Sequence, residues 1–178
     1  MNEEEKSAAT RLDHYMPVWH FREVHSVPVK ASREEVLRVT KEATWKEAPA
    51  ARFLLLFTKN QISSDSRIVD DFAKDGKNTL EIGESELVYG GIGTDAGPIE
   101  SDRPLSEIFR EFDEPGHTKI VFNFRYLDGR LFTETRVFLT DEERKRQFGR
   151  YWRIIRIPSG MTRLSLLHAV QRRVRAAA

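Results

Sequence analysis

The residues that decide the fold run from Lys119 to Leu139 and read KIVFNFRYLDGRLFTETRVFL. Apolar and polar side chains alternate along both halves of this stretch, a pattern that is typical of β-strands. Asp128-Gly129 separates the two halves, and this dipeptide favours a type I′ turn because both central residues of such a turn need a positive φ. The stretch therefore predicts a tight antiparallel β-hairpin.

The turn also predicts which side chains share a face of the hairpin, because a two-residue loop sets the register of its strands. Asn123 should lie opposite Glu134, and Val121 opposite Arg136. One face then carries four polar and three apolar residues, namely Asn123, Arg125, Glu134, Arg136, Val121, Phe132 and Phe138. The other face is richer in aromatic and aliphatic residues, namely Ile120, Phe122, Phe124, Tyr126, Leu131, Thr133, Thr135 and Val137.

A long helix is predicted directly after the hairpin. Thr140-Asp-Glu-Glu143 is a capping box, in which the first and last side chains bind the free backbone N–H groups of the helix start. An apolar stripe follows at helical spacing, formed by Phe148, Tyr151, Trp152 and Ile155. We expect Thr140–Ile157 to pack this stripe onto the sheet, and Pro158-Ser-Gly160 to kink or break the helix.

The same C-terminal segment is strongly basic. From Asp141 to Ala178 it has ten Lys or Arg and three Asp or Glu, a net charge of +7 in a chain whose total is +1. Such asymmetry can mark a surface for nucleic acid or for an anionic membrane. No stacking motif or known nucleic-acid module accompanies the charge, so we expect a solvated helix face and no specific nucleic-acid partner.

The chain before the hairpin is expected to begin with a strand and a capped helix. Trp19–Lys30 alternates like a strand, and Pro28 places it at an edge or an end of the sheet. Ser32-Arg-Glu-Glu35 is a second capping box, and its helix should run to about Trp45. Further helices are predicted over residues 48–60 and 65–75, and further strands over 79–82 and 86–89.

Length and composition place this chain among ordinary globular proteins. Its 178 residues favour one domain, and we expect a loose leader over residues 1–16 and a single domain over residues 17–178. The sequence has no cysteine, which fits a cytoplasmic protein. The longest aliphatic run, Phe53–Phe57, is too short to cross a bilayer.

No motif for a metal, a cofactor or a catalytic nucleophile stands out. The five histidines lack metal-ligand spacing, so a metal site is not expected. Gly90-Gly-Ile-Gly93 lacks the strand and helix that flank a dinucleotide fingerprint, and no cofactor is expected. Ser159 lacks the motif of a nucleophile elbow, so no residue is assigned a catalytic role.

The order of strand, helix, helical insert, antiparallel strands and long C-terminal helix resembles the helix-grip fold of the START-like (SRPBCC) superfamily. The resemblance is closest to a bacterial branch, and it spans about Tyr15 to Ala176. The segments that carry it are Glu23-Val-His25 with Val27-Pro-Val-Lys-Ala31, Phe112-Asp-Glu-Pro-Gly116 with Asn123-Phe124-Arg125, and Thr133-Glu-Thr-Arg136 with Phe148, Tyr151-Trp152 and Ser159-Gly160. It implies an α+β fold in which an antiparallel sheet wraps around the C-terminal helix and encloses a cavity.

The resemblance also implies that the first strand lies antiparallel beside the last. Glu23 and His25 could then share a face with Glu134 and Arg136, and through them with Asn123 and Arg125. Such a polar ladder could be a structural ion-pair network, could orient a ligand, or could use His25 as a general base. Two apolar rows compete for the interior, because Val27 shares the face of Glu23 while Phe122 and Phe124 lie on the opposite face of the hairpin.

The expected function is the binding of a small hydrophobic or amphipathic molecule in the internal cavity. The candidate ligand-binding residues are Glu23, His25, Asn123, Arg125, Glu134, Arg136, Tyr151 and Trp152, with Arg136 as the anchor for an anionic group. Two alternatives stay open: a cyclase-, dehydratase- or hydrolase-type enzyme, and an interaction module that uses the basic helix. The enzyme is the runner-up to ligand binding and is not the favoured function, the interaction module is third, and a homodimer is possible.

Overall fold

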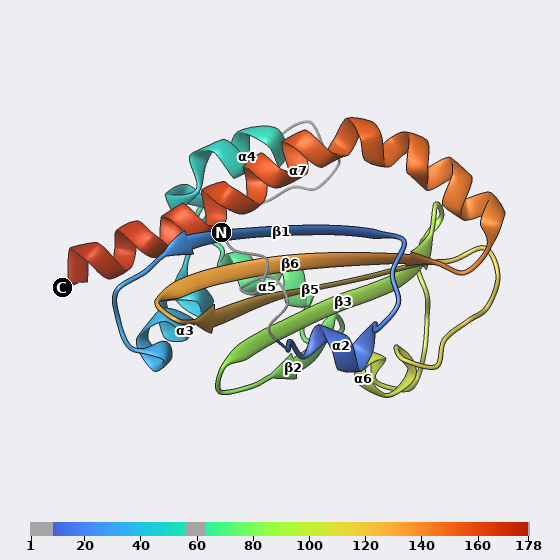
Figure 1. Ribbon diagram of the computed structural model, residues 1–178, viewed down its shortest axis with the longest axis horizontal. Coiled ribbons are helices and arrows are strands. Elements are labelled where there is room, and N and C mark those ends of the chain that lie inside the picture. The colour runs from blue at the N-terminus through green and yellow to red at the C-terminus, as the bar shows by residue number, and fades with distance from the viewer. Residues whose placement is uncertain (1–8, 56–62, 178) are drawn as a thin grey trace.

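The computed structural model describes residues 9–55 and 63–177. Its centre is an antiparallel sheet with the strand order β1-β6-β5-β3-β2, and β4 pairs with β3 (Figure 1). The strands are β1 (Phe21–Pro28), β2 (Thr79–Ile82), β3 (Glu86–Thr94), β4 (Gly97–Pro98), β5 (Thr118–Leu127) and β6 (Arg130–Leu139). The helices are α2 (Leu12–Tyr15), α3 (Arg33–Glu42), the 3₁₀ helix η1 (Trp45–Glu47), α4 (Pro49–Leu55), α5 (Ile68–Ala73), α6 (Leu105–Ile108) and α7 (Glu142–Ala177).

This architecture confirms the predicted α+β fold, with an antiparallel sheet and a long C-terminal helix packed against it. The predicted helix over residues 48–60 is observed as α4, and the rest of that range lies outside the described residues from residue 56 to residue 60. Within the described ranges, no helix is both long and apolar enough to cross a membrane.

The β5–β6 hairpin forms as the sequence predicts. Asp128 and Gly129 have φ angles of 48° and 74°, as a type I′ turn requires. Val121 pairs with Arg136, which confirms the predicted register. Two residues further along the hairpin, the backbone N–H of Glu134 donates to the side-chain oxygen of Asn123 at 2.7 Å. A side chain therefore replaces one backbone hydrogen bond between the two strands.

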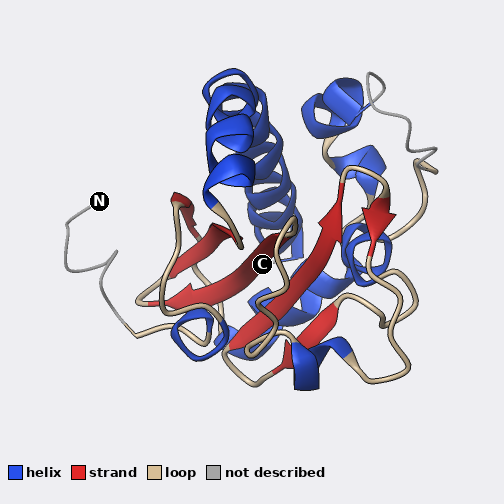
Figure 2. Ribbon diagram, turned by 90° about the vertical axis from the view of Figure 1, so that its right-hand side faces the viewer, coloured by secondary structure: helices blue, strands red, loops and turns tan. Residues whose placement is uncertain are grey.

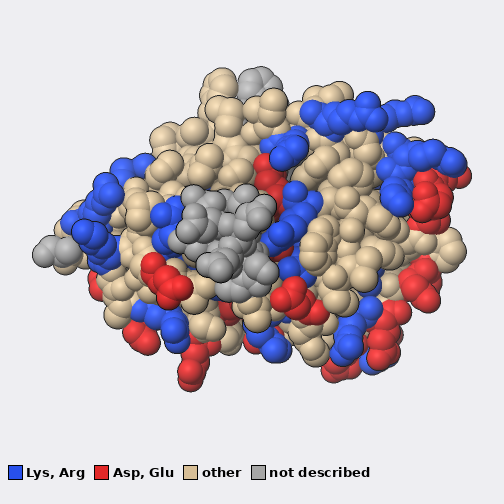
Figure 3. All heavy atoms as spheres, in the orientation of Figure 1, with Lys and Arg blue, Asp and Glu red and all other residues tan. Residues whose placement is uncertain are grey.

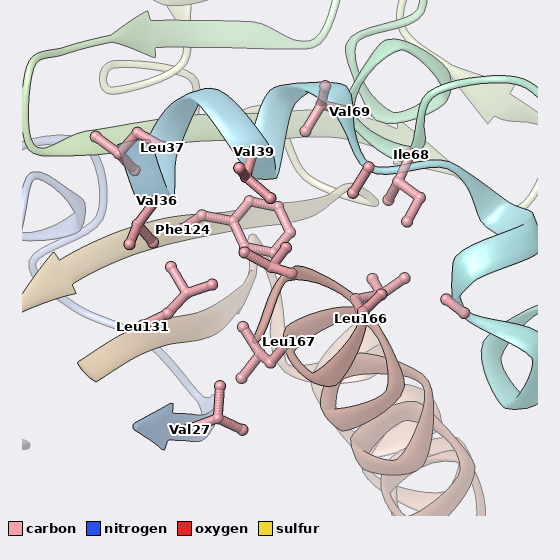
Figure 4. Close-up of a cluster of buried hydrophobic side chains, with 14 of the residues drawn as sticks. Val27, Val36, Leu37, Val39, Ile68, Val69, Phe124, Leu131, Leu166 and Leu167 are labelled. Atoms are coloured by element: carbon pink, nitrogen blue, oxygen red, sulfur yellow. The ribbon is translucent and has the colours of Figure 1, made fainter. Parts of the chain in front are cut away.

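The aromatic face of the hairpin is the face that the long helices cover. Side chains from α3 and α7 meet the sheet in one core (Figure 4), formed among others by Val27, Val36, Val39, Phe124, Leu131, Leu166 and Leu167. Figure 2 shows α7 rising along this side of the sheet. The conflict between the two apolar rows is therefore resolved, because Val27 and Phe124 share one face and one core.

The opposite, polar face of the hairpin is covered by the chain before β1 and by α6. Leu12, Tyr15 and Met16 form a second core with Phe109 of the α6 region and with Val121 of β5. Leu12 is 0% exposed and Met16 is 3% exposed. Residues 9–16, which the sequence predicted to be part of a loose leader, are therefore packed onto the sheet. Residues 1–8 lie outside the described part of the chain.

Helix α7 runs through Pro158 and bends without ending (Figure 1). Its second half is buried through Leu166, Leu167, Val170 and Val174. Its first half lies further from the sheet, so only part of the predicted apolar stripe is covered. Phe148 and Trp152 pack against Phe21 with ring centroids 5.3 and 5.6 Å apart, whereas Tyr151 is 54% exposed.

Candidate functional site

The predicted polar ladder of Glu23, His25, Glu134 and Arg136 is wrong in its arrangement. Strand β1 does lie antiparallel beside β6, but Glu23 pairs with Thr135 and His25 pairs with Thr133. Directly opposite residues share a face of an antiparallel pair. Glu23 and His25 therefore lie on the face of α7, while Glu134 and Arg136 lie on the other face.

Arg136 cannot anchor a ligand between the sheet and α7, because it is enclosed on the far face. Its guanidinium contacts Glu134 and Asp13 at 2.7 Å each, and it donates to the carbonyl oxygen of Met16 at 2.9 Å. The ring of Trp19 lies 4.2 Å from the guanidinium carbon. The Glu134 carboxylate also binds Arg22, so these groups form a structural network.

Asn123 and Arg125 belong to the same far-face network. The amide of Asn123 donates to Glu86 at 2.6 Å and to Thr10 at 3.0 Å. Arg125 donates to the carbonyl oxygen of Ala9 at 2.9 Å. The predicted binding residues of the hairpin thus hold the N-terminal segment onto the sheet, and only Glu23 and His25 of the predicted ladder face α7.

A different set of polar side chains meets on the α7 face. We define the polar cluster as Glu23, His25, Thr133, Thr135 and Arg163. The His25 Nε2 atom lies 3.1 Å from Glu23 Oε1, and Arg163 Nη1 lies 3.4 Å from Thr133 Oγ1. Strands β1 and β6 place the first four residues, and α7 supplies the arginine from above.

Three buried atoms of the polar cluster have neither a hydrogen-bond partner nor an ion-pair partner among the described residues: Glu23 Oε2, Thr135 Oγ1 and Arg163 Nε. Glu23 is 8% exposed and Thr135 is 4% exposed. An unsatisfied buried polar group costs about 1–3 kcal/mol, and native proteins keep few of them. These three atoms therefore have hydrogen-bonding capacity that no described residue uses.

The charge of Arg163 persists in this setting. Burial lowers the pKa of the Arg163 guanidinium to about 10, and the Glu23 carboxylate opposes that shift. The guanidinium carbon also lies 5.1 Å from the ring centre of Phe122, where the aromatic face favours a cation. Arg163 is therefore a protonated donor at neutral pH.

Gly160 sets how closely α7 approaches the polar cluster. A side-chain Cβ at this position would lie 2.8 Å from Glu23 Oε1 and 3.1 Å from His25 Cε1. Only glycine lets the helix backbone pass so near to both side chains. The glycine that follows the helix bend is thus part of the site.

A cleft of about 550 Å³ lies between the sheet and the first half of α7. Its lining includes Gly91 and Ile120 of the sheet and Arg144, Phe148 and Tyr151 of α7. Ile120 and Phe122 lie on the same face of β5, two residues apart, and Phe122 contacts Arg163. The cleft and the polar cluster thus lie on the same side of the sheet, and neither Phe122 nor any residue of the cluster lines the cleft.

The two remaining predicted binding residues, Tyr151 and Trp152, have different surroundings. Tyr151 lines the cleft, whereas Trp152 stacks on Phe148 at 5.9 Å and on Phe21. The sequence interpretation missed Arg163, which it counted only as part of a basic helix. It also missed Thr133 and Thr135, which it placed on the aromatic face without a role. Among the described residues, no group of His, Cys, Asp or Glu could hold a metal ion.

No protein-family model matches this chain, and no curated protein matches it. One similar solved structure is the quaternary ammonium Rieske monooxygenase CntA in complex with an inhibitor, at 11% identity and a TM-score of 0.34. That similarity covers 93% of this chain and 44% of the monooxygenase chain, so this chain spans less than half of its length. Another is TTHA0849 from Thermus thermophilus, at 14% identity and a TM-score of 0.32, covering 88% and 97% of the two chains. Similarity at this level supports no conclusion about function.

Proposed function

We propose that this protein binds a small amphipathic molecule between the sheet and α7. The observation that carries the proposal is the group of buried polar atoms without partners on Glu23, Thr135 and Arg163, on the side of the sheet where a cleft opens. The apolar part of the ligand would lie on Ile120, Phe148 and the glycines of β3. Its polar end would reach the cluster past Phe122.

The chemistry of the polar cluster favours a neutral hydroxyl group over an anion. Glu23 Oε2 can only accept a hydrogen bond when ionised, Arg163 Nε can only donate one, and the Thr135 hydroxyl can do both. A hydroxyl group can donate to Glu23 and accept from Arg163 at once. A carboxylate would satisfy Arg163 but would place a second negative charge beside Glu23, which disfavours it.

We also propose that the chain is a START-like (SRPBCC) protein. The support is the antiparallel sheet with its long C-terminal helix, which follows the last hairpin directly. A ligand site between that helix and the sheet is what this assignment would lead one to expect. The compartment proposed for it is the cytoplasm, on the absence of cysteine from the sequence.

Native mass spectrometry of the freshly purified protein tests the proposal first, because a retained ligand adds a defined mass. Titration with 2-naphthol, followed by its fluorescence, tests the chemistry. We expect 2-naphthol to bind more tightly than naphthalene, which lacks the hydroxyl, and than 2-naphthoate, which is anionic. Equal affinity for all three probes would contradict the assigned polar end.

Two substitutions locate the bound probe. Ile120→Trp should abolish binding by filling the cleft, because Ile120 is 37% exposed there. Arg163→Lys should weaken 2-naphthol binding about tenfold, since lysine cannot copy the directional guanidinium contacts. Ile82→Trp is the matched control, because Ile82 is an exposed strand isoleucine that does not line the cleft. Unchanged binding by Ile120→Trp would overturn the site.

A cyclase-, dehydratase- or hydrolase-type enzyme is the second candidate, and the His25–Glu23 contact at 3.1 Å favours it. A carboxylate beside an imidazole can orient it as a general base. The test compares the molecules retained by the wild-type protein and by His25→Asn. A substrate retained only by the variant would support an enzyme, and the same molecule in both would support a binding protein.

A further inference from the structure

The first half of α7 has an outer surface that the ligand site does not use. Two large apolar side chains are exposed there, Ile154 at 77% and Ile157 at 71%, and Met161, at 53%, follows just past the middle of the helix. They follow one another at intervals of three and four residues, so they form a stripe on one side of the helix. A solvated helix face would carry polar residues at these positions. The solvated face that the sequence predicts therefore does not account for these apolar side chains.

Arginines flank this stripe on the same half of the helix. Arg146, Arg150 and Arg153 are exposed on the side of the stripe, and Arg156 is exposed on the opposite side of the helix. Arg150 stands four residues before Ile154, and Arg153 stands four residues before Ile157, so both lie beside the apolar side chains. The sequence has no acidic residue from Arg144 to Ala178. Figure 3 shows the Lys and Arg side chains gathered over this end of α7, with acidic side chains below them.

The shape of the molecule leaves this surface accessible. The first half of α7 bends away from the sheet, forming an outer edge of the molecule (Figure 1). Its inner side is turned to the sheet, and a Cβ placed on Gly149 would lie 3.6 Å from the ring of Phe21. The outer side, with Ile154 and Ile157, is therefore free to meet a flat surface.

We propose that the outer face of α7 binds the surface of an anionic lipid bilayer. Helices that lie in a membrane interface insert apolar side chains below the headgroups and hold lipid phosphates with arginines. A nucleic acid would use the arginines but would leave Ile154 and Ile157 in water. The combination of an exposed apolar stripe and an unopposed positive charge thus favours the bilayer. The proposal does not depend on the ligand site.

Co-sedimentation with vesicles tests the proposal. We expect the full chain to bind vesicles of phosphatidylcholine and phosphatidylglycerol, to bind pure phosphatidylcholine weakly, and to lose binding as salt is raised. Arg150→Gln with Arg153→Gln should weaken binding roughly tenfold or more. Ile154→Ser with Ile157→Ser should weaken it to a similar degree through the lost apolar contact.

Matched controls separate this surface from charge and hydrophobicity in general. Arg33→Gln with Lys41→Gln removes the same charge from exposed positions of α3, and Val18→Ser removes an apolar side chain that is 65% exposed. Both controls should bind vesicles like the wild type. Equal losses in the α3 control, or vesicle binding that Ile154→Ser with Ile157→Ser does not change, would overturn the proposal. Tight binding to duplex DNA in place of vesicles would also overturn it.

Discussion

Replacing Glu134 with alanine is expected to lower the free energy of unfolding by about 3–5 kcal/mol, because the change leaves a buried cation without its partner. Glu134 is 3% exposed, and its carboxylate lies 2.8 Å from Arg22 Nε and 2.7 Å from Arg136 Nε. Arg136 is 2% exposed, and Asp13 is the carboxylate partner that would remain to it among the described residues. Urea denaturation followed by circular dichroism measures the loss.

An exposed ion pair provides the control for this prediction. Glu107 of α6 is 54% exposed and lies 3.5 Å from Arg103, which precedes the helix. Glu107→Ala should change the free energy of unfolding by no more than about 0.5 kcal/mol, as exposed pairs usually do. If Glu134→Ala were as mild as Glu107→Ala, the far-face network would not be the stabilising element that its burial indicates.

The far-face network explains why residues 9–16 are not a loose leader. Residues 9–16 include the apolar Leu12, Tyr15 and Met16, but a segment of eight residues is too short for its pattern alone to predict burial. Here it is held by polar contacts from distant strands: Glu86 accepts from Thr10 at 2.5 Å, and Asp13 binds Arg136. These partners are separated by more than 70 residues of chain, so no local pattern reveals them.

Strong local rules account for what the sequence did predict. The Asp128-Gly129 turn needs positive φ angles, and that requirement fixes both the hairpin and its register. The N-cap at Ser32 is likewise observed, since the Ser32 hydroxyl accepts from the Glu35 backbone N–H at 3.2 Å. Both features depend on residues within a few positions of each other.

The placement of the candidate site failed because no turn connects β1 to β6. A slip of one residue moves every side chain of a strand to the other face. The apolar residues predict the observed register. Aligning Val27 with Leu131 places both in one core and puts Glu23 opposite Thr135. Matching the apolar residues, instead of the charged ones, would have found the polar cluster.

Replacing Gly160 with leucine is expected to lower the free energy of unfolding by about 1–3 kcal/mol and to weaken 2-naphthol binding. Even a Cβ at this position would lie 2.8 Å from Glu23 Oε1, so a leucine must displace either Glu23 and His25 or the helix itself. A displaced helix moves Arg163, three residues further along α7, relative to Thr133, and displaced Glu23 and His25 side chains disrupt the polar cluster directly. Thermal denaturation and the probe titration measure the two effects.

Alanine at two glycines of the same helix makes the test sharper. Both changes gain about 0.5–1 kcal/mol from the better helix propensity of alanine. At Gly149 the added Cβ meets only Phe21, at an ordinary distance of 3.6 Å, so Gly149→Ala should raise the free energy of unfolding by that amount. Gly160→Ala should lose most or all of the gain to the contact with Glu23. Equal stabilisation by the two changes would show that α7 does not need its close approach over the polar cluster.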